Sequence, residues 1–268
     1  MLTEAQLDAL VTEIRRAPKY REMPMTDEVI RDVIQQESQH QSGTKAILKA
    51  AKKKLHNIAA LYLGDPDYDA MTAALSAAQG EDFKRLCLDI AAVHTSTQER
   101  LRILDTFYPR IFEVTGRPNT VLDLACALNP FLLPWMGLPL DVRYHAYDIH
   151  PPRVALVNHA FRLMGVEPLA EVRDILVHPP EQPADVALIL KEVHRFEQRR
   201  KGITRPMLEA LNARYIVVSL PVQSMSGRSD LKTSYSNLFY NIIKGTNWPV
   251  TELEFSNELV FCINRTGD

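Results

Sequence analysis

The stretch Val121-Leu122-Asp123-Leu124-Ala125-Cys126-Ala127-Leu128-Asn129-Pro130 decides the fold of this chain. Its first half is mostly apolar and predicts a buried strand, and the small residues from Ala125 to Ala127 predict a turn. Small residues after a strand let a bound nucleotide approach the backbone closely, as in nucleotide-binding folds. Ala125 and Ala127 stand where such turns usually carry glycine, so a buried strand with an ordinary loop also fits. Ala127 suits the turn if its φ is negative.

Strands and helical patterns alternate along the chain after Gly116-Arg117-Pro118. Such alternation indicates βαβ crossovers and a parallel sheet. The last two strands are separated only by Ser256-Asn257, which predicts a hairpin. The pattern indicates an α/β, Rossmann-like, seven-stranded sheet with an antiparallel C-terminal hairpin, and it resembles the class I methyltransferase fold. The predicted strands are Thr120–Ala125, Arg143–Asp148, Leu169–Arg173, Val186–Leu190, Tyr215–Leu220, Val250–Phe255 and Glu258–Ile263.

Residues 1–115 carry helical patterns and few strand-like runs. Thr3 is a candidate N-cap for a first helix, a third helix is predicted over residues 44–64, and another begins near Ser96. We therefore predict a helical N-terminal domain over residues 1–115, which binds RNA, and a catalytic domain over residues 116–268. This division places the strand-to-turn stretch near the start of the second domain.

Two acidic residues stand at the ends of successive predicted strands. Asp148 ends the second strand, where a carboxylate can accept both ribose hydroxyls of a nucleoside. Asp174 ends the third, where it can accept from the adenine amino group, with Ile149 and Ile175 on the two faces of the ring. Each acid alone is more often a helix cap. The glycines of a pyrophosphate turn are missing, which favours S-adenosylmethionine over a nicotinamide cofactor.

Two basic clusters suggest local RNA-binding surfaces on a chain whose net charge is only -2. Either cluster also fits a solvated helix face. The first contains Lys45, Lys49, Lys52, Lys53 and Lys54, and the second contains Arg195, Arg199, Arg200, Lys201 and Arg205.

Composition excludes several other classes. The chain has 268 residues and three cysteines, without a zinc-type spacing, so we expect no metal site and a reducing cytoplasm. No apolar run approaches the ~18 residues of a membrane span, and the first residues do not resemble a signal peptide. We expect no membrane association and a monomer.

Asp123-Leu124-Ala125-Cys126-Ala127-Leu128-Asn129-Pro130 closely resembles the DLACGLNP run of the aminoglycoside-resistance 16S ribosomal RNA methyltransferases. Those enzymes methylate N7 of one guanosine in the decoding A site of the 30S subunit, with S-adenosylmethionine as methyl donor. Further similar segments follow in the family's order over most of the chain from about residue 40. They are His94–Leu101 (HTSTQERL), Leu190-Lys191, Ser219–Pro221, Ser224–Arg228 and Asn257–Phe261.

The resemblance implies roles for several residues. Arg100 matches the arginine that holds the methionyl carboxylate of the cofactor, and His94, Ser96, Leu190 and Lys191 fall in cofactor-binding segments. From the residues alone, Ser96 and Glu99 form a capping box, and Arg100 would lie in a first helical turn, where the dipole disfavours a cation without an anionic partner. His94 also fits a packed core histidine. Lys191 could touch the cofactor or the RNA.

RNA contacts would come from the lysine-rich helix (Lys45, Lys49, Lys52, Lys53), from Arg199, Arg200 and Lys201, and from Arg228 with Lys232. Folded RNA is read largely through shape and phosphate contacts, which such surfaces supply. Candidates for stacking on a flipped base are Tyr235, Phe239 and Trp248, although each is more often a core residue.

The expected chemistry needs no catalytic acid or base. Guanine N7 is a lone-pair nucleophile without a proton, so positioning and desolvation can suffice, and Lys191 is the one candidate for a direct role. The sequence departs from the family at Ala127, at Glu192–Glu197 and in the loop after Arg228. Two alternatives therefore stay open: a diverged homologue that methylates another RNA site, and a cofactor-binding RNA-binding protein without activity.

Overall fold

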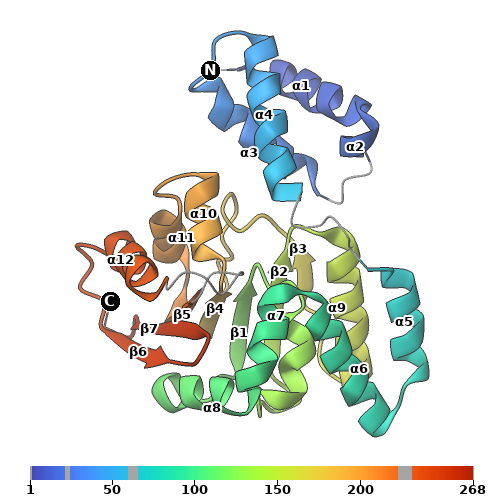
Figure 1. Ribbon diagram of the computed structural model, residues 1–268, viewed down its shortest axis with the longest axis vertical. Coiled ribbons are helices and arrows are strands. Elements are labelled where there is room, and N and C mark those ends of the chain that lie inside the picture. Colours follow the sequence, from blue (N-terminus) through green and yellow to red (C-terminus); the bar gives the residue numbers. More distant parts are fainter. Residues whose placement is uncertain (1, 22–24, 60–65, 223–230, 268) are drawn as a thin grey trace. The chain divides into compact units, whose positions relative to one another are not determined.

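The computed structural model describes residues 2–21, 25–59, 66–222 and 231–267 (Figure 1). The chain forms two compact units, one of Met1–Asp67 with Ile149–Pro152, and one of Tyr68–Asp148 with Arg153–Asp268. The predicted helical domain of residues 1–115 is thus divided, because its helices after Tyr68 pack in the same apolar cluster as the sheet.

The first unit contains helices α1 (Glu4–Arg16), α2 (Pro18–Arg21), α3 (Asp27–Ser38) and α4 (Thr44–Ala59). Thr3 caps α1 as predicted: its hydroxyl accepts from the Gln6 N–H, and the Gln6 side chain returns a hydrogen bond. Helix α4 ends at Ala59, short of the predicted Gly64, and residues 60–65 lie outside the described part. The core of the unit is built from apolar residues at helical spacing, among them Leu7, Ile14, Val29, Val33, Leu48 and Leu55.

The second unit is built on a seven-stranded sheet of order β3-β2-β1-β4-β5-β7-β6. Strands β1 to β5 are parallel, and β7 pairs antiparallel with both β5 and β6. All seven predicted strands are present, and the C-terminal hairpin is confirmed. Their bounds are β1 Thr120–Leu124, β2 Arg143–Asp148, β3 Ala170–Val172, β4 Ala184–Leu190, β5 Ala213–Pro221, β6 Val250–Glu254 and β7 Glu258–Asn264.

Helices cover both faces of this sheet (Figure 1). One apolar cluster joins the sheet to α5 (Tyr68–Ala77), α6 (Gly80–Val93), α8 (Leu104–Thr115), the 3-10 segment η3 (Asn129–Trp135) and α9 (Pro151–Met164). The other cluster joins it to α10 (Val193–Arg199), α11 (Thr204–Ala210) and α12 (Lys232–Ile242). The arrangement is a three-layer α/β/α fold.

The helix expected to begin near Ser96 is three segments: α7 (Thr95–Arg100), the 3-10 turn η2 (Leu101–Ile103) and α8. The predicted capping box is wrong, because the N-cap residue is His94 and it makes no side-chain cap. Ser96 lies inside the helix, with its hydroxyl 2.8 Å from His94 Nδ1. Arg100 consequently lies in the last turn of α7, where the helix dipole favours a cation.

The strand order reverses between β1 and β4, so the crevice outside their carboxyl ends is where open α/β sheets bind ligands. The backbone there enters the left-handed region at Ala125 (φ 54°), Ala127 (φ 47°) and Lys191 (φ 63°). The condition stated for Ala127, a negative φ, is therefore not met. The tight return of the chain after β1 requires the conformation that glycine supplies in the resembling family, and an L-residue adopts it at a cost of about 1–2 kcal/mol.

Replacing Ala127 by glycine should therefore raise the free energy of unfolding by about 1 kcal/mol, because the strain exceeds the entropy that glycine adds to the unfolded chain. Equilibrium urea unfolding measures this. The matched control is Ala155→Gly on the exposed face of α9, which should lower stability by about 1 kcal/mol. Equal losses in both variants would contradict the strain at Ala127.

Candidate cofactor-binding site

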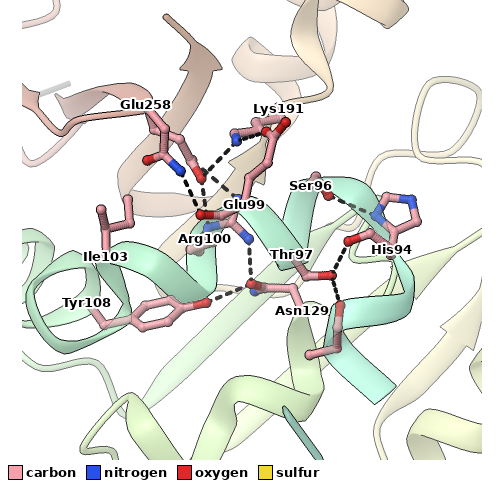
Figure 2. Close-up of polar contacts among 12 residues, drawn as sticks. His94, Ser96, Thr97, Glu99, Arg100, Ile103, Tyr108, Asn129, Lys191 and Glu258 are labelled. Carbon is pink, nitrogen blue, oxygen red and sulfur yellow. Dashed lines mark hydrogen bonds and ion pairs between the residues drawn. The ribbon is translucent and has the colours of Figure 1, made fainter. Parts of the chain in front are cut away.

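The guanidinium of Arg100 is fully buried and held on three sides (Figure 2). Nη1 donates to Asn129 Oδ1 at 2.9 Å, and Nη2 donates to Glu258 Oε2 at 3.3 Å. Nε lies 3.2 Å from Glu258 Oε1, and the Phe107 ring lies 4.9 Å from the guanidinium carbon. The anionic partner expected for Arg100 is thus a carboxylate of the chain itself in this structure.

Lys191 completes a buried cluster of charges around Glu258 (Figure 2). Its Nζ lies 2.7 Å from Glu99 Oε2 and 3.3 Å from Glu258 Oε1, and its side chain is 5% exposed. Because Lys191 follows β4, Glu258 begins β7 and Arg100 ends α7, the cluster ties three elements together at the carboxyl end of the sheet. The left-handed backbone of Lys191 directs its side chain into this cluster.

A chain of hydrogen bonds continues from Arg100 toward β1. Asn129 Oδ1 also accepts from the Tyr108 hydroxyl at 2.6 Å, and its Nδ2 donates to Asp123 Oδ2 at 2.9 Å. The Tyr144 hydroxyl donates to the same Asp123 oxygen at 2.7 Å. Burial raises the pKa of Asp123 to about 7, against the opposing effect of these two donors.

Asp148 lies beside the turn that follows β1, as its predicted contact with ribose requires. Its Oδ2 accepts from the Ala127 N–H at 3.1 Å and from Arg153 Nη1 at 3.2 Å. The carboxylate is buried, and the same turn is tied to β2 by the Cys126 N–H, which donates to the Tyr147 carbonyl at 2.9 Å. A carboxylate next to a left-handed turn at the switch point fits the ribose of a nucleoside cofactor.

Asp174 and Arg199 form a close pair that the sequence did not indicate. Arg199 Nη2 lies 2.6 Å from Asp174 Oδ2, and Asp174 Oδ1 accepts from the Leu176 N–H at 3.1 Å. Arg199 was expected to face RNA, but its side chain is only 10% exposed. Ile149 packs with the helical cluster of the first unit and Ile175 packs on the sheet, so the adenine sandwich stays a prediction.

His94 and Leu190 are both packed at the carboxyl end of the sheet. Burial, with Arg153 and Arg195 nearby, lowers the pKa of His94 to about 4, so the imidazole is neutral at pH 7. Leu190 lies in the apolar cluster between the sheet and α6 and α8. A neutral His94 hydrogen-bonded to Ser96 can donate or accept at its other nitrogen, which suits a polar ligand.

The predicted RNA-contacting residues differ in exposure. Lys45, Lys49 and Lys53 are exposed and follow each other at four-residue spacing along α4, whereas Lys52 is half-buried. Arg200 and Lys201 are exposed, and Lys232 pairs with Glu254 at 2.6 Å. Arg228 lies outside the described residues.

The prediction that Phe239 can stack on a flipped base is wrong, because Phe239 is 1% exposed and is stacked on Phe261 with ring centroids 3.8 Å apart. Tyr235 packs beside His194, with ring centroids 5.3 Å apart. Trp248 lies under Arg265, whose guanidinium carbon is 4.5 Å from the ring centroid.

Sequence reasoning missed Glu258, Asn129 and Glu192 as parts of the site. Glu258 and Asn129 stand inside the motifs quoted for the family, but a motif does not say which member pairs with which. Glu192 accepts from Arg195 at 3.0 Å, and burial raises its pKa to about 7. The position of Glu192 shortly after β4 does not by itself predict that it pairs with Arg195.

Taken together, Asp148 beside the turn, the buried guanidinium of Arg100 and a neutral His94 fit an uncharged nucleoside that carries an amino-acid end. Among the described residues, no three or more histidine, cysteine, aspartate or glutamate side chains gather as metal ligands. Nor does this part of the chain contain a helix long and apolar enough to cross a membrane.

Substitution of Glu258 by glutamine should lower the free energy of unfolding by about 3–5 kcal/mol, because it leaves the buried Arg100 without a carboxylate and leaves Lys191 with Glu99 alone. Chemical unfolding measures the loss. Glu254→Gln on the same hairpin removes an exposed partner of Lys232 and should cost less than about 1 kcal/mol. Similar small losses in both variants would mean that the buried charges do not hold the site together.

Comparisons with known proteins agree with this geometry. Residues 16–262 match the family model of the ribosomal RNA methyltransferase FmrO. A 16S rRNA (guanine(1405)-N(7))-methyltransferase of Micromonospora rosea is 35% identical over 225 residues, which cover 81% of this chain and 82% of the relative. A 16S rRNA (guanine(1405)-N(7))-methyltransferase of Serratia marcescens is 31% identical over 261 residues, which cover 97% of this chain and 98% of the relative.

Solved structures agree as well. The 16S rRNA methyltransferase RmtF in complex with S-adenosyl-L-homocysteine has a TM-score of 0.78 and 28% identity, covering 99% of this chain and all of RmtF (100%). The 16S rRNA methylase RmtB also has a TM-score of 0.78, at 27% identity, over 96% and 98% of the two chains. Because the family model matches residues 16–262 and relatives above 30% identity cover most of the chain, this chain belongs to the FmrO family of ribosomal RNA methyltransferases.

Proposed function

We propose that this chain transfers a methyl group from S-adenosylmethionine to N7 of guanine 1405 of 16S rRNA within the 30S subunit, in the cytoplasm and as a monomer. Modification of this A-site nucleotide would confer aminoglycoside resistance. The observation that carries the proposal is the match over nearly the whole chain to a 16S rRNA (guanine(1405)-N(7))-methyltransferase. The charge cluster at the carboxyl end of the sheet supports it, because it supplies a place for the methyl donor.

The cofactor is assigned to the crevice outside β1 and β4. Asp148 would accept from the ribose hydroxyls, Asp174 from the adenine amine, and Arg100 would bind the methionyl carboxylate. His94 and Ser96, which are hydrogen-bonded to each other, would border the same crevice, and the left-handed turn at Ala125 and Ala127 would let the backbone approach the cofactor. When bound, S-adenosylmethionine supplies a methyl group on a positively charged sulfur.

The residues of the site position the reactants rather than exchange protons. Guanine N7 attacks with a lone pair and has no proton to lose, so no general base is required. Lys191 is held by Glu99 and Glu258, and its ammonium can donate to the guanine or to the cofactor. Burial of this region removes water from the approach of the nucleophile, which strengthens each charged contact.

RNA would be bound through exposed cations. The row formed by Lys45, Lys49 and Lys53 on α4 can follow successive phosphates, and Arg200 and Lys201 add a second contact after α10. Such contacts recognise the folded subunit by its backbone and shape. Target selection would then depend on the loops beside Lys191.

Labelled S-adenosylmethionine and purified 30S subunits test the reaction, with reverse-transcription mapping after borohydride–aniline cleavage at N7-methylguanosine. The proposal predicts a single stop at guanine 1405. Incorporation at another nucleotide would support methyl transfer to RNA but would contradict guanine 1405 as the target. Cofactor binding without incorporation would favour an RNA-binding protein that has lost activity.

One observation favours the alternative of a different RNA target. Glu192 and Arg195 form a polar pair directly after Lys191, where the resembling family has a leucine- and proline-rich turn. A charged pair beside the target base would change which base edges are accepted. The mapping experiment separates the two targets directly.

Charge reversal of Lys45, Lys49 and Lys53 together should weaken 30S binding at least about tenfold and make the salt dependence of log K shallower by about 2, since roughly three phosphate contacts are lost. Filter binding at several salt concentrations measures both. The control reverses Arg117, Arg162 and Lys244, three exposed cations of the second unit. Affinity for S-adenosylhomocysteine should not change. Equal effects of the two triple variants would contradict a binding role for the α4 row.

A further inference from the structure

We propose that Asn129 is the positioning residue for the amino-acid end of the cofactor, because it fixes the guanidinium of Arg100 at the angle that receives the methionyl carboxylate. The inference rests on the proposed function and deepens it. Asn129 need not touch the cofactor itself. Its effect passes through the 2.9 Å hydrogen bond from Arg100 Nη1 to its Oδ1 (Figure 2).

Arg100 has more donors than the chain uses. A guanidinium carries five N–H groups. Of the hydrogen bonds from Arg100, Nη1 makes one to Asn129 and Nη2 makes one to Glu258, and Nε faces Glu258 Oε1 at 3.2 Å. Phe107 covers one face of the group. Because each Nη carries two N–H groups and uses one, a planar fork held by Asn129 and Glu258 keeps one N–H on each Nη for a second carboxylate.

The orientation of the Asn129 amide is itself determined by its neighbours. Its oxygen accepts from Arg100 and from the Tyr108 hydroxyl, and its nitrogen donates to Asp123 and, at 3.3 Å, to the Tyr144 hydroxyl. Rotating the amide by half a turn would place its N–H groups against the Arg100 donors and its oxygen against the Asp123 oxygen. Only one orientation satisfies the buried neighbours, so the amide is a rigid acceptor for Arg100.

Asn129 also links the two halves of the cofactor site. It begins η3, directly after the turn that holds Asp148, and its N–H donates to the Cys126 carbonyl at 2.9 Å. The turn serves the adenosine half, whereas Arg100 serves the amino-acid half. Truncating only the side chain of Asn129 should therefore disturb the amino-acid half and leave the adenosine half unchanged.

Isothermal titration calorimetry with two ligands separates these halves. S-adenosylhomocysteine carries both the adenosine and the amino-acid end, whereas 5′-methylthioadenosine lacks the amino-acid end. In the wild-type chain, the affinity for S-adenosylhomocysteine divided by the affinity for 5′-methylthioadenosine reports the contribution of the amino-acid end. Arg100→Lys should reduce this ratio, because lysine cannot form the planar fork.

Asn129→Ala should weaken S-adenosylhomocysteine about tenfold and leave 5′-methylthioadenosine within about twofold, as the loss of a hydrogen bond to a charged group predicts. Tyr108→Phe is the milder variant, since it removes one contact of the amide and keeps the packing, and it should lower the ratio by a smaller factor. The matched control is Asn158→Ala, which removes a structural amide that bridges to both backbone groups of Ala170. The control should keep the wild-type ratio.

An unchanged ratio in both Asn129→Ala and Tyr108→Phe would overturn the positioning role. Parallel losses for the two ligands would also overturn it, because they would indicate a general structural role. If the wild-type chain binds neither ligand, the proposed function fails instead. If the wild-type ratio is near one, the assignment of Arg100 to the methionyl carboxylate fails before Asn129 is tested.

Discussion

The carboxylate of Glu258 is the constraint on which the rest of the site depends. It is fully buried and faces two cations, Arg100 from α7 and Lys191 from the end of β4. Buried charges are tolerated only when they are paired, so the three elements must meet in one arrangement. The left-handed backbone of Lys191 fits this requirement, because the Lys191 ammonium reaches the first residue of β7, with Nζ 3.3 Å from Glu258 Oε1.

The positions assigned to the cofactor are each satisfied by the chain itself. Arg100 meets Glu258, Asp148 meets Arg153, and Asp174 meets Arg199. The cofactor would therefore add contacts to these ion pairs or replace some of them, and it would not neutralise charges that have no partner. Since the gain from such an exchange is a difference between two charged hydrogen bonds, affinity depends on how well the site holds its donors in place.

The strands were predictable from the sequence and several site contacts were not. Alternating apolar runs with intervening helical patterns identify a parallel sheet, and the two-residue separation of β6 and β7 identifies the hairpin. Asp148 could be placed because strand ends converge at one edge. The pairing of Arg100 with Glu258 joins residues 158 positions apart, and no local pattern encodes it. The capping box at Ser96 failed because the helix begins before Ser96, at Thr95, with His94 as its N-cap.

A crystal structure of the chain with S-adenosylhomocysteine tests the central claim most directly, namely that the charge cluster around Glu258 holds the amino-acid end of the cofactor. The account predicts a methionyl carboxylate oxygen within about 3.2 Å of the Arg100 guanidinium, with Asn129 still accepting from Nη1. It also predicts the ribose hydroxyls at Asp148. A ligand whose carboxylate lies away from Arg100, with the pair of Arg100 and Glu258 unchanged and closed to it, would contradict the account.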